Sequence, residues 1–107
     1  MDAKRIKFER TGGFAGIRFA ADFELNDLPN NEAHQILAFL DDVDFEKLPA
    51  QITGNQQVAD GFSYSITVFT EHHQQTVVTS DTSAPNKMKP LLELLTQIAR
   101  EQLRNKK

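Results

Sequence analysis

The sequence lacks cysteine and tryptophan altogether, over a length of 107 residues. Without cysteine there are no disulfide bonds, no thiolate nucleophile and no cysteine-based zinc site. Small secreted domains usually depend on disulfides, so their absence predicts a reducing compartment, of which the cytoplasm is the simplest. No apolar run approaches the roughly 18 residues that argue for a membrane-spanning helix, and no signal-peptide core follows Met1. We therefore expect a cytoplasmic protein without membrane contact.

Strong charge of either sign is also missing. A net charge of −3 and a charged fraction of 25% are ordinary for a soluble globular chain of this length, which we expect to form one domain over residues 1–107. Nucleic-acid binding needs clustered cations, and the basic residues cluster only at the C-terminal end, at Arg100, Arg104, Lys106 and Lys107. We interpret that cluster as favourable charge near a helix C-terminus, followed by a tail. No nucleic-acid partner is predicted.

The residue patterns of catalytic sites are lacking as well. His72 and His73 are adjacent, so on an extended strand they would face opposite sides and not share one metal ion. The acidic residues between 41 and 46 lack the glycine-centred loop of a calcium site. No phosphate-binding loop or nucleophile–histidine–carboxylate constellation is recognisable. We therefore predict a binding protein with no catalytic residues, no cofactor and no metal.

What the chain does have is alternation around a glycine pair. Apolar and charged residues alternate on both sides of Gly12-Gly13, over residues 5–24. This pattern is typical of a β-hairpin, in which glycine supplies the positive φ of a tight turn. Phe14 falls at or near the tip, where water should reach it. A large apolar side chain there either packs back onto the sheet or awaits a partner.

The remaining segments complete an α+β pattern. Apolar residues recur at helical spacing over residues 33–43 and 88–103, and alternation indicates strands at 62–69 and 76–80. We expect Asn30 or Asn31 to cap the first helix, and Pro90 to lie in the first turn of the second. Residues 50–61 are polar and irregular, the longest candidate loop. The order ββαββα predicts a four-stranded antiparallel sheet with two helices packed on one face.

Chain direction in this arrangement decides which connections meet. If each element reverses the direction of the one before it, the connections 11–14, 50–61 and 81–86 lie at one end of the domain. The connections 26–31 and 71–74 lie at the other. The alternation also predicts a filled apolar core, and so disfavours a ligand pocket between sheet and helices.

Several short motifs, taken together and in order, resemble one known family, the emfourins. The resemblance starts at Phe8-Glu9-Arg10-Thr11-Gly12-Gly13-Phe14-Ala15-Gly16-Ile17 and spans nearly the whole chain. It continues through the first helix, Asp44-Phe45, Leu48-Pro49-Ala50, Phe62-Ser63-Tyr64, Ile66-Thr67-Val68, Val78-Thr79-Ser80-Asp81, Ala84-Pro85 and Pro90-Leu91-Leu92 with Leu94. The resemblance implies a non-enzymatic inhibitor of thermolysin-like (protealysin-like) zinc metalloproteases that blocks the substrate cleft.

The inhibitor residues are our own hypothesis from the expected loop positions. We assign protease contact to Gly12, Gly13 and Phe14, flanked by Asp81, Thr82 and Ser83. Phe14 would fill the apolar pocket of the cleft, and Asp81 would approach the metal or bond the cleft wall. Asp81 is equally suited to ending a strand or capping a helix.

Two alternatives stay open. The alternative segment for insertion into the protease cleft is Leu28-Pro29 at the opposite end, an apolar residue followed by a rigid proline. The competing function is a non-catalytic interaction or adaptor domain whose partner is not a protease. In either case we expect a monomer.

Overall fold

The computed structural model describes residues 2–12, 18–52, 61–81 and 83–105. They form one antiparallel sheet in the order β2-β1-β3-β4, with two α-helices and three short 3-10 turns. This confirms the predicted ββαββα order and α+β class. The elements are β1 (Arg5–Gly12), β2 (Phe19–Glu24), η1 (Leu25–Asp27), α1 (Asn30–Asp42), η2 (Phe45–Lys47), β3 (Phe62–Phe69), β4 (Gln74–Ser80), η3 (Asn86–Met88) and α2 (Lys89–Asn105).

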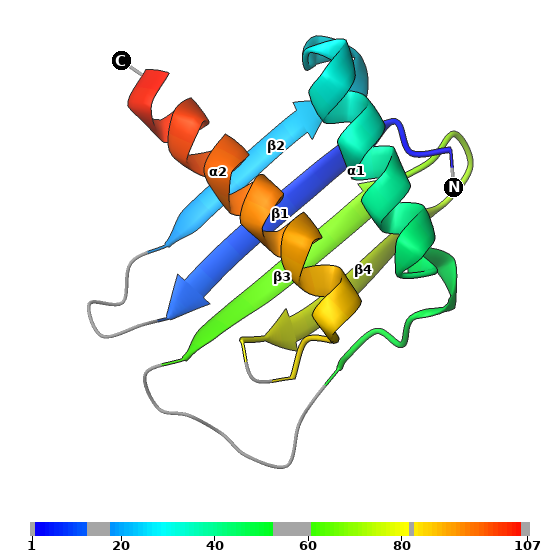
Figure 1. The fold of residues 1–107 in the computed structure, drawn as a ribbon, viewed down its shortest axis with the longest axis vertical. Coiled ribbons are helices and arrows are strands. Elements are labelled where there is room, and N and C mark those ends of the chain that lie inside the picture. The colour runs from blue at the N-terminus through cyan, green and yellow to red at the C-terminus, as the bar shows by residue number, and fades with distance from the viewer. Residues whose placement is uncertain (1, 13–17, 53–60, 82, 106–107) are drawn as a thin grey trace.

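Both helices lie on the same face of the sheet, as Figure 1 shows. Alternation along the strands turns one set of side chains toward them, and Ile6, Phe8, Ile66 and Val77 are almost completely buried. From the helices, the fully or nearly buried side chains are Ile36, Leu40, Leu91, Leu92, Leu95, Ile98 and Ala99. The predicted apolar core therefore lies between sheet and helices. Neither helix is long and apolar enough to cross a bilayer, within the part of the chain described.

The opposite face of the sheet carries polar cross-strand pairs. Arg5 donates two hydrogen bonds to the Asp22 carboxylate, at 2.6 and 2.7 Å. The hydrogen bond from Arg5 is the main reason why the pKa of Asp22 is lowered. Arg18 bonds Glu9 at 2.9 Å. Pairs of this kind let one face of an antiparallel sheet remain in water.

The outer edge of β4 is covered by the chain that precedes β3. Gln51 forms a parallel bridge with Val78. The Ile52 amide donates to the Val78 carbonyl and the Val78 amide to the Ala50 carbonyl, both at 2.8 Å. The expectation of an irregular loop from residue 50 was therefore wrong for its first residues. Ile52 is half-buried against the core, and this apolar contact orders the segment.

Proline, rather than asparagine, precedes the first turn of α1. Pro29 occupies the N-cap position with φ −54° and ψ 146°, and no side chain caps the helix. The Pro29 carbonyl accepts the Ala33 amide at 3.0 Å. The expected cap by Asn30 or Asn31 was therefore wrong, because the helix starts at Asn30 itself. For α2, Pro90 lies in the first turn as predicted.

The residue after the C-cap of α1 has an unusual backbone. Asp44 adopts the left-handed conformation, with φ 51° and ψ 55°, and is the non-glycine residue with positive φ in the described ranges. We expect Asp44→Gly to raise the free energy of unfolding by about 0.5–1 kcal/mol, because glycine carries no Cβ penalty there. Urea unfolding will measure it. The control Ala38→Gly, at an exposed position inside α1, should lower the free energy of unfolding by about 1 kcal/mol. A loss of stability in Asp44→Gly would contradict the assignment of strain to Asp44.

Candidate functional site

Three strand ends meet at one end of the sheet, where β1 ends, β3 begins and β4 ends. Gly12 is paired with Phe62, and Ser63 with Ser80. The Asp81 amide donates to the Phe62 carbonyl at 3.1 Å. Figure 1 shows the three strand ends side by side. The predicted chain direction is therefore confirmed for the strand ends, while much of the connections 11–14 and 50–61 lies outside the described residues.

The hypothetical contact residues divide between described and undescribed positions. Gly12, Asp81 and Ser83 have described positions at this end. Gly13, Phe14 and Thr82 lie outside the described residues. We call the described set Gly12, Phe62, Asp81 and Ser83 the loop end.

Asp81 is bonded within the domain through both carboxylate oxygens. Its Oδ2 accepts the Phe62 amide at 3.1 Å, and its Oδ1 accepts the Tyr64 hydroxyl at 2.6 Å. Burial raises the pKa of Tyr64, and the hydrogen bond to Asp81 raises it further. Asp81 thus fastens the end of β4 to the start of β3. This is the strand-ending role that the sequence allowed for it.

A compact turn follows β4. The amides of Ser83 and Ala84 both donate to the Ser80 carbonyl, at 3.2 and 2.9 Å. The hydroxyl of Ser80 donates to that of Ser83 at 2.9 Å. A loop held by such bonds loses less conformational entropy when a partner binds it.

Position 12 requires glycine for two reasons, its backbone conformation and the close approach of Gly61. It has φ +103°, and a Cβ built on it would lie 2.7 Å from the Gly61 carbonyl oxygen. The close approach of residues 12 and 61 is therefore possible only without a side chain. Gly12 is the last residue of β1 and is paired with Phe62, so the expectation that it lies in the turn was wrong. Gly13 lies outside the described residues.

The alternative segment for insertion, Leu28-Pro29, lies at the other end of the molecule. Leu28 is half-buried and packs against the core, and its amide donates to the Leu25 carbonyl at 3.2 Å. Pro29 is exposed. Part of the Leu28 side chain is thus already occupied by the protein's own core, which leaves less of it for a cleft.

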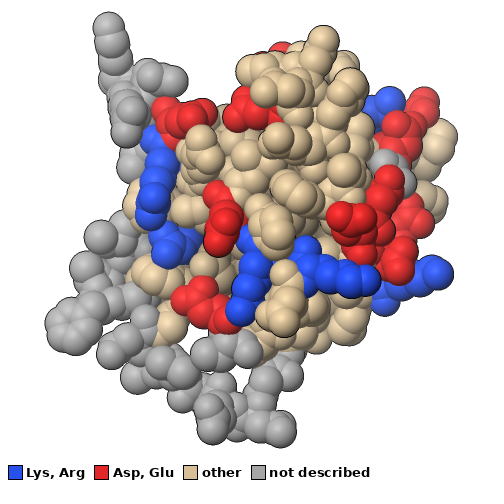
Figure 2. All heavy atoms as spheres, in the orientation of Figure 1, with Lys and Arg blue, Asp and Glu red and all other residues tan. Residues whose placement is uncertain are grey.

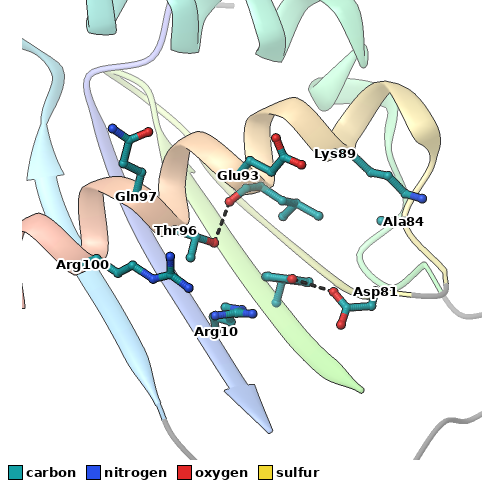
Figure 3. A pocket seen from close by; sticks show the side chains of 10 residues that line it. Arg10, Asp81, Ala84, Lys89, Glu93, Thr96, Gln97 and Arg100 are labelled. Atoms are coloured by element: carbon teal, nitrogen blue, oxygen red, sulfur yellow. Dashed lines mark hydrogen bonds between the residues drawn. The ribbon is translucent and has the colours of Figure 1, made fainter. Parts of the chain in front are cut away.

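A hollow beside the loop end contradicts the expectation that no pocket lies between sheet and helices, because the charged Arg10 takes an inward position there. It has a volume of about 610 Å³ and lies between the sheet and α2, where Arg10, Tyr64, Asp81 and Arg100 line it (Figure 3). The guanidinium carbon of Arg10 lies 3.6 Å from the centre of the Phe62 ring. The sequence held a signal for it, because Arg10 continues the inward alternation of Ile6 and Phe8.

The described side chains form no metal cluster: no group of three or more histidine, aspartate or glutamate residues among them could hold a metal ion. His72 and His73 are exposed between β3 and β4. On the face that Figure 2 shows, acidic and basic side chains are interspersed. Such a mixture is unlike the continuous basic stripe of a nucleic-acid interface.

The fold and the loop end define a class: a small α+β domain that presents several chain connections at one end. The Emfourin family model matches residues 8–96. The chain therefore belongs to the emfourin family, a family of protease inhibitors, as the sequence motifs predicted. Searches of the curated proteins and of the solved structures gave no match.

Proposed function

We propose that the protein inhibits thermolysin-like zinc metalloproteases by inserting the loop end into the substrate cleft. The observation that carries this proposal is the family match over residues 8–96. The gathering of three strand ends at one end of the sheet supports it, because groups that are already ordered lose less entropy when they bind. The inhibitor acts without catalysis and without a cofactor, as a monomer, on a protease of the same cell.

In this proposal the hairpin tip supplies the inserted residue. We assign protease contact to Gly12 and Gly13, and Phe14 fills the apolar pocket beside the zinc ion. Asp81 supports the tip from the neighbouring strand end, because its two carboxylate oxygens are bonded to Phe62 and Tyr64. We assign contact with the cleft wall to Thr82 and Ser83.

The first test is inhibition of thermolysin, and of a thermolysin-like protease from the same genome, by the purified protein. A quenched peptide substrate and a pre-incubation series would measure it. We expect stoichiometric loss of activity, without loss of zinc and without cleavage of the inhibitor. No inhibition of the cognate protease at micromolar excess would contradict the proposal and leave an adaptor domain with a different partner.

Phe14→Ala and Leu28→Ala distinguish the two ends of the domain. We expect Phe14→Ala to raise the inhibition constant by at least about tenfold, as loss of an apolar anchor does. Leu28→Ala should leave the inhibition constant within about twofold of the wild type, once its fold is verified by circular dichroism. The reverse result would assign the cleft to Leu28 and Pro29, and if neither variant weakens inhibition, both assignments are wrong.

A further inference from the structure

Two arginines that line the hollow between the sheet and α2 form no salt bridge with a described carboxylate. Four arginines have described side chains, and they divide into two pairs of different kinds. Arg5 and Arg18 each form a salt bridge on the open face, at 2.6 and 2.9 Å from Asp22 and Glu9. Arg10 and Arg100 line the hollow. Within the described ranges, neither of these two has a carboxylate in salt-bridge contact.

Arg10 is held in a fixed orientation by aromatic rings. Its guanidinium carbon lies 3.6 Å from the centre of the Phe62 ring, 5.8 Å from that of Phe19 and 6.0 Å from that of Tyr64. Rings stacked on the face of a guanidinium leave its in-plane N–H groups available as donors. Arg10 also hydrogen-bonds the Tyr64 hydroxyl, and this bond opposes the rise in the pKa of Tyr64. The Nε of Arg10 is buried and has no hydrogen-bond partner among the described residues. A buried donor of this kind costs free energy unless a ligand satisfies it.

Arg100 approaches the same place from α2. Its guanidinium carbon lies 5.6 Å from the centre of the Phe19 ring, which Arg10 also approaches. In Figure 3 the two guanidinium groups point into the hollow from the helix and from β1. Two cations that share one aromatic ring repel each other when nothing lies between them.

Among the described residues, the acidic side chains that line the hollow form no salt bridge with this pair. Asp81 is occupied by the Phe62 amide and the Tyr64 hydroxyl. Glu93 makes no salt bridge within the described part of the chain, and Figure 3 shows it near Lys89 on α2, apart from the two arginines. The surroundings therefore favour an anion from outside the domain.

We propose that this hollow binds an oxyanion, a carboxylate or phosphate group, between the guanidinium groups of Arg10 and Arg100. Planar guanidinium forks match the two oxygens of such groups and form short charge-assisted hydrogen bonds. The group belongs either to a free small anion or to an acidic side chain of the partner protease, because the hollow adjoins the loop end at Asp81. Only the second source rests on the proposed function.

Binding of the free anion tests the site without any protease. Inorganic phosphate and then citrate would be titrated into the protein at constant ionic strength, with the Arg Nε–H and backbone amide resonances followed by NMR. We expect saturable shifts at Arg10 and Arg100, and an affinity at least about tenfold weaker in Arg100→Gln, which loses one bidentate contact. The control Arg5→Gln removes the same charge on the open face and should bind like the wild type.

Two results would overturn the proposal: shifts in the wild type that do not saturate, or equal binding by Arg100→Gln and Arg5→Gln. Arg10→Lys is the second variant, since it keeps the charge but loses the planar fork, and it should also bind more weakly. Arg100 is exposed on α2, so its substitution should leave the fold intact.

Inhibition assays in phosphate-free buffer then identify the source of the oxyanion. An inhibition constant raised about tenfold by Arg100→Gln, but not by Arg5→Gln, identifies an acidic side chain of the protease. An unchanged inhibition constant, together with lost phosphate binding, identifies a free anion. If the protein inhibits no protease, the proposed function fails, while the NMR titration still decides whether the oxyanion site exists.

Discussion

Asp81→Ala is expected to lower the free energy of unfolding by about 2 kcal/mol, because hydrogen bonds to a charged group are worth more than neutral ones. The substitution leaves the Phe62 amide and the Tyr64 hydroxyl without the acceptors that they have now, at 3.1 and 2.6 Å. Asp81 is exposed, so water replaces part of what is lost and keeps the loss from being larger. Denaturant unfolding monitored by circular dichroism will measure the change.

Two further variants separate stability from contact with a protease. Tyr64→Phe removes one of the two bonds and should cost about 1 kcal/mol. Asp81→Asn keeps one acceptor and should cost about the same. If Asp81 only positions the loop end, these two variants weaken inhibition equally. A much larger effect of Asp81→Asn on the inhibition constant would show that the carboxylate itself contacts the protease.

Ionisation of the Tyr64 hydroxyl makes the free energy of unfolding depend on pH. The pKa of Tyr64 is raised in the folded state above the ordinary value of 10.0. The unfolded chain therefore ionises first, so this contribution to stability is complete below pH 10 and is lost as the pH rises through the folded pKa. Wild type should lose more stability than Tyr64→Phe across this alkaline range. Equal losses in the two proteins would show that Tyr64 is not the group responsible.

Gly12→Ala is expected to lower the free energy of unfolding by about 2–3 kcal/mol, from left-handed strain and from a backbone clash together. The residue has φ +103°, and its new Cβ would lie 2.7 Å from the Gly61 carbonyl oxygen. Neither neighbour can move aside as a flexible side chain would. Thermal and urea unfolding of the variant will measure the loss.

Ser63→Ala is the matched control for Gly12→Ala, since Ser63 is exposed at the same end of the sheet. It should change the free energy of unfolding by less than about 0.5 kcal/mol. An equally small effect of Gly12→Ala would show that β1 can separate from residue 61 at little cost. Under the proposed function, Gly12→Ala also weakens inhibition, because it displaces the hairpin tip.

The fold could be predicted from the alternation of apolar residues in the strands and from their spacing in the helices. Both patterns indicate which side chains face the core. Ile6 and Phe8, or Leu91 and Leu95, define a buried face whatever their partners are. Chain reversal then placed the three connections at one end. The family motifs indicated a protease inhibitor, a class that the charge and hydrophobicity patterns did not indicate.

What escaped prediction depends on contacts between distant residues. Composition does not reveal that Pro29 would take the N-cap position, or that residues 51 and 52 would pair with β4. Nor does the order of residues show that Arg10 would stack on Phe62 and face Arg100, which is 90 positions further along the chain. The sequence shows only that Arg10 follows the same alternation as the apolar residues before it. Which side chains surround it depends on the register of β1 with β3, which the sequence does not reveal.

The pairing of Ile52 with β4 has a consequence for the length of the connection to β3. The Ile52 amide is bonded to the Val78 carbonyl, and residue 61 directly precedes β3. Closing a connection between two fixed anchors costs only about 0.6 kcal/mol for each doubling of its length. Doubling the length of the chain between these two anchors should therefore lower the free energy of unfolding by less than about 1 kcal/mol.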